Sequence, residues 1–280
     1  MNQILWSLGL ILLGVKVQGQ QGLEKIIVEK YYVSDSMDGV KSHGKLPAGS
    51  STYRIYADML PAYRFQAAYG IACHELRFAT TTSFYNNEEV TTAIANEVPR
   101  RMLSDNTVML DSWLSVGAAA EGYYGVLKTD DTSAAVINSD GCLQNANGAA
   151  GIPVKVKDGM YAASPMSAVT VYGLNDSVLS VFKISSEKKD GQVFSTSNGS
   201  WASIGGAIGP PPANRVLIAQ VTTDGIFSFE LNIQIGSVTG GTENYVARNP
   251  TGKEILFAGL TYSSAENVPS KVRDKHPTGK

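Results

Sequence analysis

Short stretches in which polar residues alternate with hydrophobic ones recur along most of the chain. Residues 23–33, 51–58, 63–69 and 74–84 mix β-branched and aromatic side chains with polar ones, and Gly, Pro or Asp residues bound them. A period of two between such boundaries is typical of strands with one face buried. We expect these segments to form one continuous antiparallel sheet.

The last third of the chain returns to the same pattern. We expect strands at residues 168–172, 178–184, 192–195, 216–221, 226–235 and 254–262. In 226–235 the large apolar residues, Phe227 to Ile235 at every second position, fall on one face and should meet the core. The residues between them, from Ser228 to Gln234, should contact solvent.

The middle of the chain is less regular. Residues 88–104 predict a short helix that ends before Pro99, and residues 107–115 and 123–128 are candidate strands. Residues 138–152 have the composition of a loop.

Short strands separated by turn residues predict an all-β protein, an antiparallel β-sandwich. It is either one large sandwich or two small ones. With two, a β-rich domain over 20–158 precedes a β-sandwich domain over 159–262, and the boundary falls near the Gly-rich loop 145–152 or at 162–165. Residues 263–280 lack apolar periodicity and are expected to form a flexible tail.

The N-terminal segment predicts export. Residues 4–15 form an uncharged apolar run, shorter than the ~20 residues of a membrane-spanning helix. The run matches the centre of a signal peptide over residues 1–19, with cleavage after Gly19. The alternative is a buried N-terminal strand. No later segment is apolar enough to span a bilayer, so we expect no membrane span in the mature chain.

Composition narrows the function classes. Only 17% of the 280 residues are charged and 28 are Gly, which argues against a coiled coil, a helical bundle or a charged disordered tail. The net charge of −2 gives no general cationic surface for nucleic acid or anionic lipid.

Export also changes how the cysteines are interpreted. Cys73 and Cys142 are an even pair outside the reducing cytosol, so a disulfide between them is one reading. A buried free thiol at Cys73 is the other.

Acidic loops offer a structural calcium site, the only cofactor that the sequence suggests. Asp35, Asp38 and Asp130-Asp131 lie in turn-like segments, and carboxylates with backbone carbonyls suit Ca²⁺. Asp residues that cap turns are the ordinary alternative.

Enzyme chemistry has few candidates. His74 is the one histidine in a strand-like setting and the one plausible general base; otherwise it is a strand residue that faces solvent. No Gly-x-Ser-x-Gly motif is present. Two carboxylates in or near ordered segments could form a hydrolytic pair; otherwise these side chains are solvated charges. The candidates are Glu75, Glu88, Glu89, Asp111 and Glu230.

Trp201 is the candidate ligand platform, because it stands in a polar, Gly-rich stretch. Its ring would stack on a sugar, with the Asn198 amide and the Ser200 hydroxyl orienting the ligand. A buried sandwich tryptophan is the alternative, and it is the expectation for Trp113.

Several segments resemble a group of secreted Bacteroidetes proteins. They are residues 52–58, 69–70, 108–114, 194–201 and 227–236. The resemblance implies an extracellular or envelope location and supplies no catalytic residues. Some members of the group lie within larger proteins exported by the type IX system. Here only the polar tail follows Tyr262, with no folded sorting domain, so the periplasm stays an alternative to secretion or the cell surface.

Together these features predict a secreted, non-enzymatic β-sandwich protein for surface adhesion, matrix or glycan binding. Its partner would be an extracellular glycan or a surface protein. One alternative is a secreted glycoside or ester hydrolase that uses carboxylates. Another is a structural subunit that assembles through an exposed edge strand.

Overall fold

The computed structural model describes residues 21–105, 107–132, 157–163, 166–183 and 191–267. The expected signal peptide, the loop 138–152 and residues 268–280 of the expected tail 263–280 lie outside these residues. The first residues of that tail, 263–267, belong to the last strand and to a 3-10 turn.

Most strands belong to three sheets. The β2 sheet has the order β1 (Leu23–Val33), β2 (Ser51–Met59), β12 (Asn214–Thr223), β5 (Trp113–Leu114). The β3 sheet has the order β16 (Ile255–Leu256), β15 (Thr242–Val246), β14 (Asn232–Gly236), β3 (Arg64–Gly70), β11 (Gly199–Ala207), β9 (Thr170–Tyr172). The β4 sheet has the order β10 (Val193–Thr196), β4 (Leu76–Thr80), β13 (Phe227–Glu230), β17 (Thr261–Ser263). Every pair in them is antiparallel except β15 with β16.

The remaining elements are short. The β7 sheet consists of β6 (Ala118–Ala120), β7 (Tyr123–Gly125) and β8 (Met160–Ala162). The α-helices are α1 (Ser36–Lys41) and α2 (Asp176–Leu179). The 3-10 turns are η1 (Ala95–Glu97), η2 (Arg100–Ser104), η3 (Val108–Leu110), η5 (Ser180–Phe182), η6 (Ala258–Leu260) and η7 (Ser264–Asn267). None of the helices in the described residues has the length and apolar character needed to cross a bilayer.

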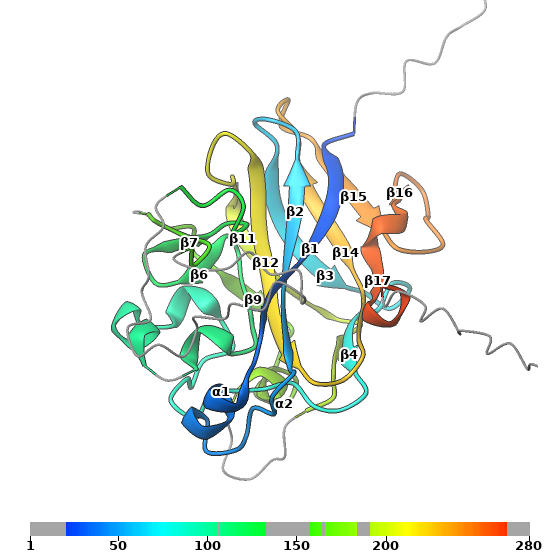
Figure 1. Cartoon of the computed structure of the whole chain (residues 1–280). Helices are drawn as coiled ribbons and strands as arrows, with labels where there is room; N and C mark the ends of the chain where they lie inside the picture. Colours follow the sequence, from blue (N-terminus) through cyan, green and yellow to red (C-terminus); the bar gives the residue numbers. More distant parts are fainter. Residues whose placement is uncertain (1–20, 106, 133–156, 164–165, 184–190, 268–280) are drawn as a thin grey trace, which may run out of the picture.

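The main core lies between the β2 sheet on one side and the β3 and β4 sheets on the other. Ile55 of β2, Phe65 of β3 and Phe78 of β4 belong to the same buried cluster. In Figure 1 the strands β1, β2 and β12 run through the middle of the molecule, with β15 to β17 on the right. This arrangement confirms the predicted all-β, antiparallel sandwich-type fold.

A third layer covers the outer face of the β2 sheet. Residues between Tyr85 and Tyr123 form a second apolar cluster with Tyr56 of β2 and Leu217 of β12. They lie on the left in Figure 1, around β6 and β7. As a result β2 is buried from Thr52 to Met59, on both faces, whereas its alternating pattern predicts a half-buried strand.

The sheets do not divide at residues 158/159, where we expected a domain boundary in the two-sandwich alternative. Each of the four sheets contains strands from both sides of that position. The longest such pairing joins β2 to β12, from Met59 with Asn214 to Ser51 with Thr223. The described residues therefore form interleaved sheets and not two successive sandwiches.

The expectation of one continuous N-terminal sheet is wrong. β1 and β2 share a sheet, but β3 and β4 lie in two others. Between β2 and β3, Ala62 adopts a φ of 69°, and between β3 and β4 a β-bridge joins Ile71 to His74. These tight turns redirect the chain at the points where the alternating pattern is interrupted.

The segment 226–235 has the predicted apolar face but changes sheet in its middle. The apolar residues from Phe227 to Ile235 are buried as expected. The strand breaks at Leu231, so β13 enters the β4 sheet and β14 the β3 sheet. Asn232 is buried instead of facing solvent, because its Nδ2 donates to the carbonyls of Tyr69 and His74, both at 3.1 Å.

Other predicted elements differ more. In the predicted strand 178–184, residues 178–182 are helical, because the side chain of Asn175 accepts from Val178 N and caps α2, which η5 follows directly. The predicted helix over 88–104 is two 3-10 turns on either side of Pro99. The Gly-rich strand β11 was not expected.

An aromatic row crosses the inner face of the β4 sheet. Phe194, Phe78, Phe229 and Tyr262 are successive register partners on β10, β4, β13 and β17. Their ring centroids are 6.0, 6.1 and 5.4 Å apart in that order. Offset and edge-on ring pairs at such distances stabilise a core beyond simple burial.

Replacing Phe78 should destabilise the fold strongly, because this fully buried ring touches five other aromatic rings. We expect Phe78→Ala to lower the free energy of unfolding by about 3–5 kcal/mol, measured by urea denaturation. Ile204→Ala, at an 81% exposed position on β11, is the control and should change it by less than about 0.5 kcal/mol. Equal effects of the two substitutions would contradict this account of the core.

Candidate functional site

The structure places Trp201 where it cannot stack on a ligand, which corrects the predicted platform. Its side chain is fully buried in the main core. The indole Nε1 donates to the carbonyls of Ser115 and Ile218, both at 3.1 Å. The polar sequence around Trp201 forms β11, and alternation along that strand turns the ring inward. Trp113 is buried as expected.

Asn198 and Ser200 lie near the surface, where the partners of Ser200 across the sheet are Tyr69 on β3 and Tyr172 on β9 and not the ring of Trp201. Asn198 is exposed at the turn before β11, where its backbone N donates to Thr196 Oγ1 at 3.1 Å. Ser200 precedes Trp201 on β11 and points to the other face. The structure therefore gives these residues no common site with Trp201.

His74 is buried, whereas a solvent-facing side chain was the main expectation. Its Nε2 lies 2.9 Å from Glu254 Oε2, and the same oxygen accepts from Thr251 N at 2.6 Å. Although burial opposes it, the bonds from Thr251 and His74 lower the pKa of Glu254. The pair fastens the loop before β16 to the start of β4, which is a structural role.

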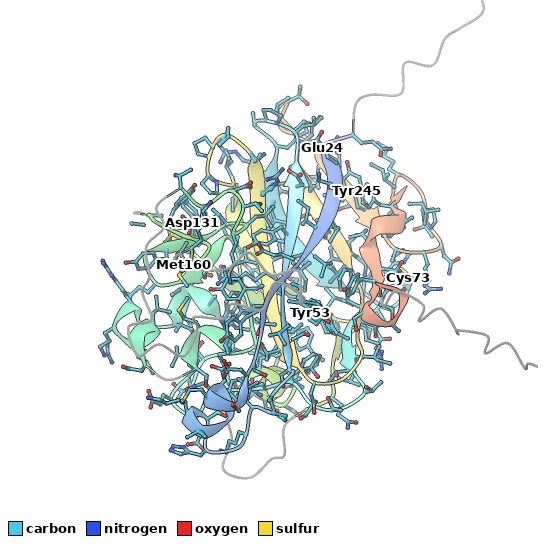
Figure 2. All side chains as sticks on the ribbon, in the orientation of Figure 1. Glu24, Tyr53, Cys73, Asp131, Met160 and Tyr245 are labelled. Carbon is cyan, nitrogen blue, oxygen red and sulfur yellow. The ribbon has the colours of Figure 1, made fainter. Side chains whose placement is uncertain are left out.

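Cys73 is exposed, so it is not the buried thiol of the alternative reading. Figure 2 shows it on the side of the molecule away from Asp131. Cys142 lies outside the described residues, and the disulfide stays a prediction.

The candidate hydrolytic carboxylates have separate partners. Asp111 is buried and accepts from Asn87 N at 2.6 Å, and burial raises its pKa well above the usual range. Glu88 pairs with Lys45 and His43, and Glu230 pairs with Arg248. Glu75 and Glu89 are exposed. None of the contacts found in the described residues joins two of these carboxylates.

The aspartates of the candidate calcium loops bind groups of the protein itself. Asp35 and Asp38 form a capping box at the start of α1, with Asp35 Oδ1 accepting from Met37 N at 2.8 Å. Asp130 pairs with Arg215, and Asp131 Oδ2 accepts from Gly159 N at 3.0 Å. Within the described ranges, no three His, Cys, Asp or Glu residues come together as metal ligands.

An open hollow of about 460 Å³, here called the proline groove, is the candidate site. It lies where the start of β12, the loop before it, the segment after β7 and Tyr161 of β8 meet. Its lining residues are Val126, Leu127, Thr129, Asp130, Thr132, Tyr161, Pro210, Pro211, Pro212, Ala213 and Arg215. Pyrrolidine rings and one aromatic ring give it an apolar surface beside a charged edge.

The charged edge is an arginine fixed between two carboxylates. Arg215 Nε donates to Asp58 Oδ2 at 3.2 Å, and Nη1 donates to Asp130 Oδ2. Lys25 Nζ lies 3.6 Å from the same Asp58 oxygen. Burial opposes the charge on Arg215, but the two carboxylates outweigh it and raise its pKa. The guanidinium is therefore a permanent cation of fixed orientation.

The aromatic ring of the groove is also held in place. The hydroxyl of Tyr161 donates to the carbonyl of Asp130 and accepts from Thr132 N at 3.1 Å. A ring anchored through its hydroxyl loses little conformational freedom when a ligand packs against its face.

Directly behind the groove lies a buried group of ionisable residues, here called the charge cluster. Its members are Glu29, Tyr31, Arg54, Tyr56, Lys128, Asp131 and Asp158. Lys128 and Asp131 follow Val126 and Leu127 of the groove along the same segment. The main chain therefore links the two features.

Arg54 is the centre of the charge cluster and is 1% exposed. Its Nε donates to Gln220 Oε1 at 2.8 Å and its Nη1 to the carbonyl of Gly159 at 3.0 Å. The guanidinium carbon lies 3.6 Å from the centre of the Tyr31 ring. A buried cation is tolerated only with such hydrogen bonds and stacking.

Lys128 is buried against the same ring. Its Nζ lies 4.4 Å from the centre of Tyr31, and its backbone N donates to Glu29 Oε1 at 2.7 Å. Burial, together with the positive charge of Arg54, lowers the pKa of Lys128 to about 8.

Two buried aspartates close the cluster beside Met160, which Figure 2 labels next to Asp131. Asp158 Oδ1 accepts from Met160 N at 3.1 Å, and its Oδ2 is buried with no hydrogen-bond partner in the described residues. Burial, and then the charge of Asp131, raise the pKa of Asp158 to about 7. Neither aspartate stood out as part of an acid pair in the sequence, because residues 131 and 158 are far apart in the chain.

The raised pKa of Asp158 predicts a pH dependence of stability. Between the usual aspartate value of about 4 and about 7, the folded chain keeps a proton that the unfolded chain has lost. The free energy of unfolding should therefore fall as the pH rises through this window. Asp158→Asn keeps the acceptor for Met160 N but cannot ionise, so we expect it to raise the free energy of unfolding by about 2 kcal/mol at neutral pH.

Urea denaturation at about pH 4 and about pH 7.5 checks this, since the gain should be present only at the higher pH. Asp224→Asn changes an exposed aspartate and serves as the control. A variant Asp158→Asn that destabilises the chain equally at both values would contradict the prediction.

Comparisons with known proteins do not add to this geometry. No protein-family model matches the chain, and neither a curated protein nor a solved structure matches it. The resemblance to secreted Bacteroidetes proteins therefore stays a prediction from the sequence.

Proposed function

We propose that this chain is an exported, non-enzymatic protein that binds an extracellular glycan in the proline groove. Support for export comes from the apolar N-terminal run at residues 4–15. Support for binding comes from the groove, because it combines fixed ring faces with a fixed charged edge.

The proposal rests on one observation: Tyr161 and the prolines line the same hollow as Arg215 and Asp130. The carbon-bound hydrogens of a sugar ring pack on aromatic and pyrrolidine faces, while its hydroxyls need donors and acceptors at the edge. Arg215 supplies donors and Asp130 an acceptor. The proposal thus keeps the predicted function but moves the platform from Trp201 to Tyr161.

The charge cluster supports binding by holding the wall of the groove in place. Tyr56 donates to the carbonyl of Val126 at 2.9 Å, and Asp131 accepts from Gly159 N. These bonds tie the segment after β7 to the β2 sheet and to β8. A wall that is already ordered loses less conformational entropy when a ligand binds.

Removing the ring of Tyr161 should abolish most of the binding. We expect Tyr161→Ala to weaken the affinity for a glycan found by array screening about tenfold or more, because a stacked ring contributes on the order of 1–2 kcal/mol. Tyr161→Phe keeps the ring face and should weaken binding clearly less. The measurement is titration calorimetry of the purified chain with the neutral glycan that gives the strongest array signal.

Tyr172→Ala is the matched control, because it removes a 52% exposed tyrosine from β9, outside the groove. It should leave the affinity unchanged, and all variants should keep their circular dichroism spectra. The proposal is wrong if no neutral glycan binds, or if Tyr161→Ala and Tyr172→Ala behave alike.

A further inference from the structure

The outer face of the β4 sheet carries a second hollow, of about 350 Å³, with a different chemistry. We call it the arginine groove. Its polar lining consists of Arg77, Ser228, Glu230, Arg248, Thr261 and Ser263. It shares no lining residue with the proline groove. β4 and β17 mark its place in Figure 1, away from β6 and β7.

The strand register builds the floor of this groove. Glu230 of β13 is the partner of Arg77 on β4 and of Thr261 on β17. Ser228 is the partner of Ser263, two residues further along on the same face. Side chains of directly opposed residues lie on the same face of a sheet and within reach of each other. A charged row and a hydroxyl row therefore lie side by side.

The second arginine lies outside the β4 sheet, two residues after β15 of the β3 sheet. Arg248 follows the end of β15, and its Nε donates to Glu230 Oε2 at 2.8 Å. Its side chain is 65% exposed, and that of Glu230 is 33% exposed. An ion pair this accessible contributes little to stability, so the pair is not required to hold the fold.

The charges in the groove do not balance. Two guanidiniums face one carboxylate, and in the described part of the chain no ion pair engages Arg77. Guanidinium groups bind carboxylate and sulfate oxygens through two parallel hydrogen bonds. Glu230 already presents one such carboxylate to Arg248, which shows the type of group that fits.

We propose that the arginine groove binds an anionic group, a carboxylate or a sulfate, carried by an extracellular polysaccharide. Arg77 and Arg248 provide the charge, and the hydroxyls of Ser228, Thr261 and Ser263 provide further hydrogen bonds. Glu230 competes with the ligand for Arg248. The inference goes beyond the proposed function, because it concerns another face and a charged ligand.

The test uses three polymers at low ionic strength, where exposed charges are least screened. The purified chain is titrated with polygalacturonate, dextran sulfate and neutral dextran. We expect binding to at least one of the two polyanions and not to dextran through this groove. Polygalacturonate alone identifies a carboxylate ligand, and dextran sulfate alone identifies a sulfate ligand.

Two substitutions should act in opposite directions. Arg77→Gln should weaken polyanion binding about tenfold, which is the loss typical of a charge-assisted hydrogen-bonded contact. Glu230→Gln removes the competing carboxylate and should strengthen binding severalfold. Arg64→Gln changes an exposed arginine on β3 and is the matched control, with an effect of twofold or less.

Three results would overturn the inference: no binding to either polyanion, equal losses with Arg64→Gln and Arg77→Gln, or weaker binding with Glu230→Gln. The equal losses would point to diffuse attraction by net charge. Arg77→Gln should leave neutral-glycan binding unchanged, and Tyr161→Ala should leave polyanion binding unchanged. Failure of one groove is therefore distinguishable from failure of the other.

Discussion

A charged guanidinium in the middle of β2 is the constraint on which the layered arrangement depends. Arg54 is buried on the face of β2 that turns away from the main core, where an unpaired cation would cost several kcal/mol. Its partners come from separate parts of the chain: the Tyr31 ring from β1, Gln220 from β12 and the carbonyl of Gly159 beside β8. Ordering these partners brings the third layer over the sheet. Burial lowers the pKa of Lys128 and raises that of Asp158, and the like charges of Arg54 and Asp131 add to these two shifts.

The alternating pattern predicted the strands correctly where one face of the strand is buried and the other contacts solvent. It predicted their burial poorly where a further layer covers the outer face. The alternation in 51–58 identifies β2, but it cannot reveal that residues 85–123 cover the outer face. The segment 226–235 shows the same limit. Its apolar face is as predicted, yet the strand changes sheet at Leu231, where the side chain of Asn232 donates to the carbonyls of Tyr69 and His74. Such contacts join residues more than 150 positions apart, and local periodicity contains no information about them.

Trp201 shows why local composition does not identify a ligand platform. A tryptophan among Ser, Asn and Gly residues suggests an exposed ring, but small residues also let strands approach closely around a large one. The indole N–H is the polar group of Trp201 that would otherwise favour solvent exposure. In the core it donates to the carbonyls of Ser115 and Ile218. Conversely, Tyr161 and Arg215 lacked any local signal, since they become neighbours only through the pairing of β7 with β8 and of β2 with β12. Three consecutive prolines at 210–212 indicate a loop, but the sequence does not show which residues they meet.

The core also determines which polar residues meet on the surface. On the β4 sheet, the aromatic row of Phe78, Phe229 and Tyr262 faces inward, and the adjacent row of Arg77, Glu230 and Thr261 faces outward. A slip of one residue in register would exchange the two rows and place the charges in the core. The aromatic contacts oppose that slip, so they fix the spacing of the outer charges as well. The ion pair in the arginine groove contributes little to stability, so the aromatic packing beneath the groove determines its geometry. Its charged residues can therefore be changed without loss of the fold.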